Sequence, residues 1–183
     1  MQILDRFNIA PSYRRFKDIV MVLRKSPSLP YIKVNTDGSL RNISAACGGI
    51  FRDQTGAFMG GFSAFLGNIS VLEAEIMSFI LAMEMAAKHN WRYIWIEGNS
   101  TSALLVFSKP SLVPIRWRNR WHNCFIGMHI LSSHIYREGN GCADKLAGFG
   151  HSITDTVWWD SLPDFARGDF SRDRVGLPSF RFP

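Results

Sequence analysis

The sequence predicts a mixed α/β fold in which an antiparallel hairpin runs into alternating strands and helices. Residues 31–37 alternate as a strand, and two further strands, at 47–52 and 57–65, are joined by a turn into a hairpin. A long apolar helix follows, and then two more strands, at 93–97 and 129–136, with helical segments between and after them. This order of elements predicts a mixed sheet with helices on its faces.

The helices have recognisable starts. Ser70 and Glu73 fit a capping box ahead of a helix over residues 71–89, which is apolar on most faces and should be buried against the sheet. A short helix follows the fourth strand from Ser100, another spans 114–125, and Asn140 is placed to cap a last helix over 141–149. The elements between residues 31 and 150 therefore form one α/β unit.

The segments outside this unit are short. We expect residues 1–30 to form a basic N-terminal arm or linker, 31–150 the domain, and 151–183 a tail that packs on it through Trp158 and Trp159. Apolar residues in the arm follow helical spacing among arginines and lysines: Phe16, Ile19, Val20 and Leu23. Such a helix is typical of an organelle transit segment, a nucleic-acid arm or a linker, and we favour the last two.

Composition narrows the class of protein. The 183 residues are 46% hydrophobic and carry a formal net charge of +6, which favours an anionic partner, nucleic acid first. Cys47, Cys124 and Cys142 form no CxxC pair, which fits a reducing compartment and argues against structural zinc. No apolar run is long enough to span a membrane, and no signal peptide follows Met1. We therefore expect an intracellular protein, nuclear or cytoplasmic, and organelle targeting is the less favoured alternative.

Four polar residues lie where strands end or where apolar helices begin: Asp37, Glu75, Asn99 and Asp144. Gathering buried carboxylates without a cation is costly, because like charges repel and each loses its hydration. Oxygen ligands of this kind suit Mg²⁺ or Mn²⁺, and two such ions form the clamp of phosphoryl-transfer nucleases. The sequence therefore points to a divalent-metal site.

Each of the four residues also has a purely structural interpretation. Asp37 before glycine is typical of a turn, Glu75 and Asp144 suit the positive ends of their helices, and Asn99 before Ser100 could cap a helix. Glu97 shares the face of Asn99 but lies about 6–7 Å further from the strand end, so it is no obvious substitute. The order of the four residues along the chain favours the metal site.

Four segments resemble the ribonuclease H superfamily: IKVNTDGS at 32–39, LEAEIMSFILAME at 72–84, WIEGNS at 95–100 and HIYREGNGCADKLA at 134–147. The branch they resemble is the plant RNase H-like domain related to the reverse transcriptases of non-LTR retroelements. The resemblance implies a five-stranded mixed sheet in the order 3-2-1-4-5, with strand 2 antiparallel and helices on its faces. It also implies two-metal hydrolysis, by two Mg²⁺ or Mn²⁺ ions, of the RNA strand of an RNA–DNA hybrid.

The resemblance assigns roles to individual residues. Asp37 matches the carboxylate that bridges both ions, Glu75 the second ligand, and Asp144 the last acid, beside the ion that activates water. The third acid of the family pattern falls on Asn99, so this chain departs from the pattern there. His134 matches a loop histidine that assists proton transfer, although it also fits the alternation of the fifth strand.

Three arginines are candidates for nucleic-acid contact. Arg116 and Arg120 lie on the predicted helix 114–125, beside Trp117 and Trp121, which suits phosphate contact with stacking; packed tryptophans and solvated arginines are the structural alternative. Arg137, in the loop before the last helix, is the third.

Two functional classes stay open. The first is an RNase H-type endonuclease, a hydrolase whose activity Asn99 puts in doubt. The second is a non-catalytic nucleic-acid-binding or scaffold protein of the same fold. The expected partner is an RNA–DNA hybrid or duplex, and a monomer is the default.

Overall fold

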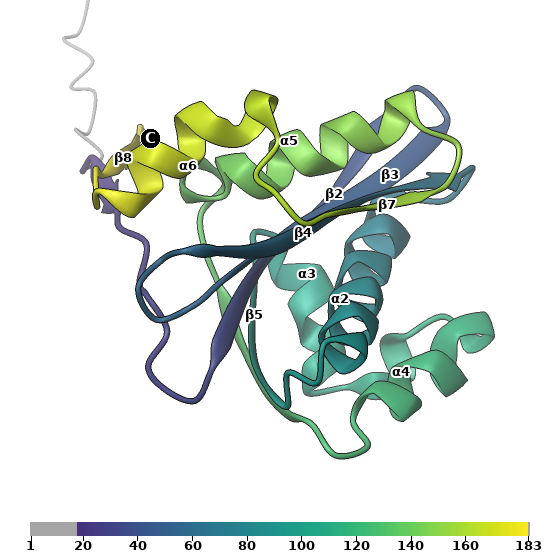
Figure 1. The fold of residues 1–183 in the computed structure, drawn as a ribbon. Helices are drawn as coiled ribbons and strands as arrows, with labels where there is room; N and C mark the ends of the chain where they lie inside the picture. Colours follow the sequence, from purple (N-terminus) through teal and green to yellow (C-terminus); the bar gives the residue numbers. More distant parts are fainter. Residues whose placement is uncertain (1–17, 183) are drawn as a thin grey trace, which may run out of the picture.

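The computed structural model describes residues 18–182, and a six-stranded mixed sheet forms its centre (Figure 1). The strand order is β6-β5-β2-β3-β4-β7, in which β2, β5 and β6 are parallel and the pairs β2–β3, β3–β4 and β4–β7 are antiparallel. The strands are β2 (Ile32–Arg41), β3 (Ser44–Arg52), β4 (Phe58–Gly67), β5 (Tyr93–Gly98), β6 (His129–His134) and β7 (Thr156–Trp159).

The predicted fold class is confirmed, and the five predicted strands occur in the predicted order, with the second antiparallel to its neighbours. The sixth strand was not predicted, because Trp158 and Trp159 were assigned to a packing tail. Phe62 of β4 pairs with Trp158, so these tryptophans extend the sheet at its edge. The domain boundaries stay a prediction.

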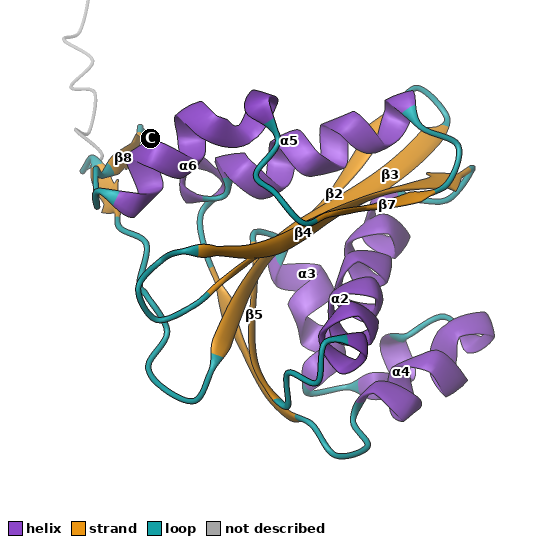
Figure 2. Ribbon diagram, in the orientation of Figure 1, coloured by secondary structure: helices purple, strands orange, loops and turns teal. Residues whose placement is uncertain are grey.

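Helices cover both faces of the sheet (Figure 2). One side carries α2 (Val71–Lys88), α3 (Thr101–Leu104) and α4 (Arg118–Cys124), and the other carries α5 (Gly141–Phe149) and α6 (Arg167–Arg174). Short 3₁₀ turns connect them at Leu105–Phe107, Pro110–Leu112, Ile115–Trp117, Arg137–Gly139, Gly150–Ser152 and Asp164–Ala166.

Two apolar clusters hold these layers together. Val34 and Ile96 of the sheet pack with Phe79 of α2 in the larger cluster, and Ile50 packs with Leu146 of α5 in the smaller one. All five side chains are fully buried, and burying each contributes roughly 1.5–3 kcal/mol. The even-numbered residues of β2 thus face α2, which leaves Lys33, Asn35 and Asp37 on the opposite face.

The capping box of α2 is confirmed. The Glu73 amide donates to Ser70 Oγ at 3.2 Å, and the Ser70 amide donates to Glu73 Oε2 at 2.9 Å. The helix ends at Lys88, one residue before the predicted end.

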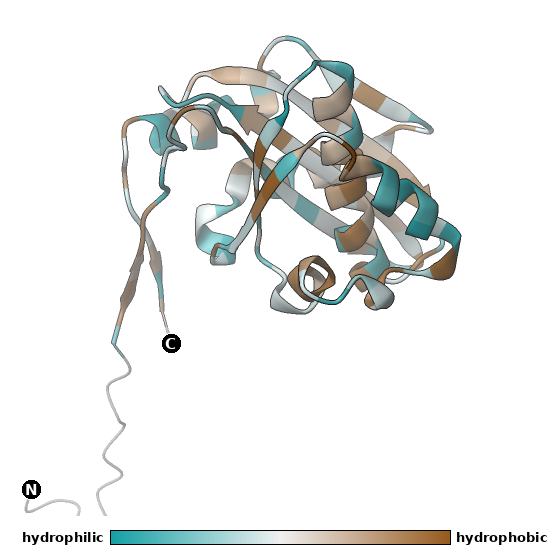
Figure 3. Cartoon of the chain, turned by 90° about the horizontal axis from the view of Figure 1, so that it is seen from below, coloured by the Kyte–Doolittle hydropathy of each residue, from teal (hydrophilic) through white to brown (hydrophobic). Residues whose placement is uncertain are grey.

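The helix predicted from the spacing of Phe16, Ile19, Val20 and Leu23 is wrong where the structure describes it, whereas the arm or linker over residues 1–30 stays a prediction. Val20–Val22 form a strand, β1, which pairs antiparallel with β8 (Ser179–Arg181) in a separate two-stranded sheet (Figure 3). The β-branched valines suit an extended chain, and the sequence gives no sign of their distant partner. The part of the predicted arm before residue 18, which includes Phe16, lies outside the described residues.

Two further features concern the described residues. None of the helices within residues 18–182 combines the length and apolar character needed to cross a membrane. Cys47, Cys124 and Cys142 are buried free thiols.

Candidate metal site at the strand ends

Two of the predicted site residues lie side by side at neighbouring parallel strands. Asp37 was expected to end its strand, but β2 continues to Arg41 through its pairing with β3, so Asp37 lies within it. Thr36 of β2 pairs with Gly98, the last residue of β5, so Asn99, which follows β5, lies beside Asp37. The carboxyl ends of parallel strands are where α/β proteins place their sites, because rigid strands fix the side chains there.

Glu75 joins them because α2 approaches β2 very closely. A Cβ on Gly38 would lie only 2.6 Å from the Glu75 backbone nitrogen, so glycine at this position permits the contact. Asp37 and Glu75 are 4% and 6% exposed. Both carboxyl groups are thus largely removed from water.

Asp144 is brought to the same place by an unexpected cross-link. Asn140 was predicted to cap α5, and it does precede the helix, but its side chain makes no capping hydrogen bond. Instead its Nδ2 donates to the Thr36 carbonyl at 2.9 Å, which ties the start of α5 to β2. Asp144, in the first turn of α5, therefore faces the end of β2.

A cleft of about 370 Å³ joins the four residues, and it is lined by Asp37, Gly38, Ser39, Leu40, Val71, Glu75, Asn99, Arg137 and Asp144. Two buried acceptors in it, Glu75 Oε2 and Asn99 Oδ1, have no hydrogen-bond partner. Asn99 is not a helix cap, because Ser100 caps α3 by accepting from the Ala103 amide at 3.2 Å. Unpartnered buried acceptors are what a cation site needs before its cation binds.

The electrostatics of the cleft also favour a cation. Burial, and then the charge of Asp144, raises the pKa of Asp37 to about 7, although Arg137 and hydrogen bonding from the Asn99 side chain oppose the rise. Burial, and then the charge of Asp37, raises the pKa of Glu75 to about 8. Crowded carboxyl groups of this kind resist ionisation until a positive charge arrives.

The donor set fits a hard divalent cation, since it offers only carboxylate and amide oxygens. A ready-made cluster of three or more His, Cys, Asp or Glu ligands does not occur among residues 18–182. Arg137 Nη2 pairs with Asp144 Oδ1 at 3.0 Å, so one oxygen of this carboxylate is already engaged.

His134 lies beside the cleft and does not line it. It is the last residue of β6, pairs in register with Gly98, and is exposed. Its ring makes an edge contact with Tyr136, with centroids 5.3 Å apart. The residue is therefore free to meet a ligand at this edge of the sheet.

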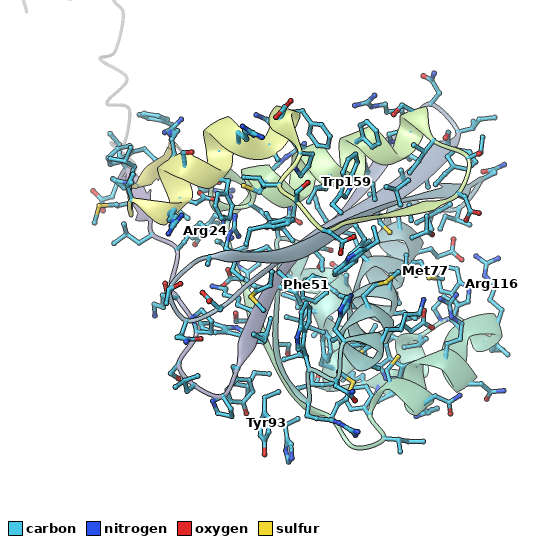
Figure 4. All side chains as sticks on the ribbon, in the orientation of Figure 1. Arg24, Phe51, Met77, Tyr93, Arg116 and Trp159 are labelled. Carbon is cyan, nitrogen blue, oxygen red and sulfur yellow. The ribbon has the colours of Figure 1, made fainter. Side chains whose placement is uncertain are left out.

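The predicted arginines of α4 and its leading turn are paired within the protein. Arg116, labelled in Figure 4, meets Glu73 of α2 at 2.5 Å. Arg120 makes two hydrogen bonds with Glu84, at 2.8 and 2.7 Å. Arg116 and Arg120 remain 53% and 42% exposed. Both therefore stay within reach of a ligand.

The tryptophans beside Arg116 and Arg120 are not within reach of a ligand. Trp117 is 9% exposed and Trp121 1%, so both pack in the core and neither offers a stacking surface. The two tryptophans therefore follow the packing interpretation, and phosphate contact by the two arginines stays a prediction.

Sequence reasoning missed the residues that support the site. Asn140 was seen only as a cap, Arg137 only as a phosphate contact, and Gly38 only as a turn. The segment Arg-Glu-Gly-Asn carries a signal for a site nearby, but the bond from Asn140 to Thr36 spans more than a hundred residues and leaves no local pattern.

Comparison with known proteins supports the same class. A family model described as reverse transcriptase-like matches residues 35–111. A curated Arabidopsis thaliana protein, named as a candidate ribonuclease H protein, is 31% identical over 159 residues, which cover 82% of this chain and 26% of the relative. The chain thus spans about a quarter of the length of that relative.

Solved structures show the same fold. RNase H1 from the archaeon Halobacterium salinarum has a TM-score of 0.60 and 23% identity, over 67% of this chain and 98% of its own. LC11-RNase H1, solved in complex with an RNA/DNA hybrid, has a TM-score of 0.57 and 22% identity, over 64% and 94%. The N-terminal RNase H domain of a Mycobacterium tuberculosis protein has a TM-score of 0.60 and 15% identity, over 67% and 94%.

The order of the sheet and the cleft beside β2 and the end of β5 define an α/β domain of the RNase H type. The matched family model and the Arabidopsis relative support the same superfamily, the ribonuclease H-like proteins.

Proposed function

We propose that this domain binds an RNA–DNA hybrid or a related duplex, holds two Mg²⁺ or Mn²⁺ ions, and hydrolyses the RNA strand weakly or not at all. The observation that carries the proposal is the cleft in which Asp37, Glu75, Asn99 and Asp144 meet, with two buried acceptors unpartnered. The carboxylates and unpartnered acceptors of the cleft are the reason to expect a cation, and the arrangement of the strands and helices is the reason to expect it at this position.

The chain's residues have distinct tasks in this proposal. Asp37, Glu75, Asn99 and Asp144 would hold the ions. Bound divalent ions lower the pKa of an attacking water and stabilise the departing oxygen. His134, exposed at the end of β6, would deliver a proton to the departing oxygen.

Arg137 links metal binding to substrate binding. Its side chain is 76% exposed and pairs with Asp144, which is 45% exposed. An exposed ion pair is worth about 0–1 kcal/mol, so a phosphate can replace Asp144 as the partner of Arg137 at small cost. The exchange would free Asp144 for an ion as the substrate arrives.

Arg116 and Arg120 supply a second phosphate contact by the same exchange. Their partners Glu73 and Glu84 are 28% and 30% exposed. Such contacts position a duplex and carry no sequence information, which suits a protein that recognises the class of nucleic acid.

The second candidate is a nucleic-acid-binding or scaffold domain without catalysis. Asn99 favours it, because the position beside Asp37 lacks the negative charge that a dication at this corner would use. We rank weak hydrolysis first, since Asp37, Glu75 and Asp144 all line the cleft.

Three measurements test the proposal on the full chain. Calorimetry with Mn²⁺ should show binding that Asp37→Asn abolishes and that Asp160→Asn, an exposed control, leaves unchanged. Hybrid affinity should fall steeply with salt, because phosphate contacts release counterions. Labelled hybrid should be cut slowly, with Mg²⁺ and with Mn²⁺. Unchanged Mn²⁺ binding in Asp37→Asn would make the carboxylates structural, and salt-independent or absent hybrid binding would remove both candidate functions.

A further inference from the structure

A second buried polar cluster lies on the face of β2 that points away from α2, near the start of the strand. Lys33 and Arg52 are paired neighbours on β2 and β3, and they meet Arg24 from the N-terminal segment and Asp173 from α6. Figure 4 shows Arg24 at the side of the molecule where α6 and β8 lie. None of these residues lines the metal cleft.

Dense contacts hold the cluster. Arg24 donates to Asp173 and to Asn35. Arg52 donates to Asp173 Oδ2 at 3.1 Å and to Asn35 Oδ1 at 3.3 Å. Lys33 Nζ lies 2.8 Å from Glu97 Oε2. The cluster therefore ties both terminal segments to the central sheet.

The buried charges of this cluster do not balance. Three cations, on Arg24, Lys33 and Arg52, have side chains 12%, 3% and 7% exposed, whereas only Asp173 and Glu97 oppose them. A buried charge without a partner is strongly destabilising. One negative charge is missing from the cluster.

Among residues 18–182, these three cations form ion pairs only with Asp173 and Glu97. The Cys142 thiol also belongs to the cluster, and it donates to Asp173 at 3.2 Å. Burial raises the pKa of Cys142, so it stays a neutral thiol. Burial, and then the charge of Arg52, lowers the pKa of Arg24 to about 9, which reflects the same excess of positive charge.

A cavity of about 50 Å³ opens beside these cations. Five cationic side chains line it, and two carboxylates: the cations are Arg24, Lys25, Lys33, Arg52 and Arg174, and the carboxylates are Asp53 and Asp173. Asp53 is occupied within its own turn, where it accepts from Thr55 and Ala57. The Nε of Arg52 is buried without a partner. A cavity of this size has room for a few water-sized groups.

We propose that this cavity is a binding site for a phosphate-class oxyanion. Arg52 would donate from Nε, and Lys25 and Arg174 at the rim would complete the charge. A tetrahedral anion offers several acceptor oxygens, which suits guanidinium groups better than chloride does. The anion would fasten the N-terminal segment and α6 to the sheet.

The source of the phosphate is either a free ion or a nucleotide phosphate, and both would use the same contacts. Binding to the folded state alone raises its stability with ligand concentration, so thermal unfolding reports the site without any activity. The wild-type chain should be stabilised by low millimolar inorganic phosphate and not by sodium chloride at equal ionic strength. Adding the wild-type chain should also broaden the ³¹P resonance of inorganic phosphate.

Rim variants keep the test interpretable, because they leave the buried cluster intact. Lys25→Ala and Arg174→Ala should each weaken phosphate binding about tenfold or more, as expected for the loss of a charge-assisted hydrogen bond. Arg167→Ala is the matched control: it lies on α6, pairs with Asp164 and does not line the cavity. Asp37→Asn should also keep the phosphate response, which separates this site from the metal cleft.

Two results would overturn the proposal: equal stabilisation of the wild type by phosphate and chloride, or an undiminished phosphate response in both rim variants. A dinucleotide with a 5′-phosphate then identifies the source. Competition with inorganic phosphate supports a nucleotide ligand. Failure to compete, when the wild type responds to inorganic phosphate, supports the free ion.

Discussion

Asn99→Asp is the most informative single change in this protein. Aspartate has nearly the shape of asparagine, so the substitution adds one negative charge beside Asp37 without new bulk. Asn99 Oδ1 already lies buried and unpartnered, which means that the position is open to a ligand. The neighbouring Glu97 does not compensate, because Lys33 and Asn35 bind its Oε2 and Ser133 binds its Oε1.

The size of the effect follows from Coulomb's law. A unit charge about 4 Å from a cationic centre contributes roughly 4 kcal/mol at an effective dielectric constant near 20. At about 1.4 kcal/mol per tenfold change in rate, stabilising the transition state by that amount would accelerate cleavage on the order of a thousandfold. The same charge has a cost without metal, because it joins Asp37 and Glu75, whose pKa values are already raised.

The assay is single-turnover cleavage of a labelled RNA–DNA hybrid in Mg²⁺. We expect slow or undetectable cleavage by the natural chain and a large gain in Asn99→Asp. Asn123→Asp adds the same charge at an exposed position of α4 and should have no effect. Asp37→Asn in the Asn99→Asp background should abolish the gain. Robust cleavage by the natural chain with no gain in Asn99→Asp would refute the reasoning about position 99.

Three further predictions concern the same architecture. Because folding raises the pKa of Asp37 to about 7, the folded state binds the proton of this carboxyl more tightly than the unfolded state. The stability that this proton contributes is full below about pH 4 and is lost as the pH rises through 7. Thermal unfolding at pH 5 and pH 8 should therefore show Mn²⁺ stabilising the protein more at pH 8. Gly38→Ala should lower the free energy of unfolding by about 1–3 kcal/mol and weaken Mn²⁺ binding, because its Cβ would meet the α2 backbone at 2.6 Å. In the same chemical denaturation experiment the control Gly168→Ala should be neutral, because a Cβ there has nothing within 4 Å. Glu84→Gln should tighten hybrid binding and steepen its salt dependence by releasing Arg120, and an unchanged salt slope would exclude Arg120 from the interface.

The parts of the fold that were predictable from the sequence are those that local chemistry determines. The capping box of Ser70 and Glu73 needs only four residues, and the turn after Asp53 needs five. Both are visible as patterns. The strand from Ile32 could be placed by its alternation of apolar and polar residues, whereas the burial of both its faces could not be predicted from that alternation.

The other parts of the fold could not be predicted, because they depend on pairing between segments that are distant in the sequence. β1 pairs with β8 across nearly the whole described chain, and β7 extends the sheet at β4, so neither strand is stabilised by its own sequence neighbours. The arginine pairs are of the same kind: Arg116 and Arg120 reach back to α2 over more than thirty residues. Periodicity reports which side of an element is apolar, and it does not report which distant charge will meet an arginine.

The candidate site depends on local sequence patterns and on long-range contacts. The long-range contacts explain why Asn99 can be accommodated without loss of the architecture. Gly38 and Asn140 bring α2 and α5 to the end of β2 through contacts with the backbone, and neither contact depends on a carboxylate at position 99. A carboxylate there would add repulsion to a cluster in which Asp37 and Glu75 already resist ionisation at neutral pH. Asparagine therefore favours the metal-free protein, and the cost falls on the metal-bound state, where one negative charge is absent. Under the proposed function, the geometry for holding nucleic acid at this edge would survive asparagine at position 99, whereas the electrostatic stabilisation needed for rapid hydrolysis would not.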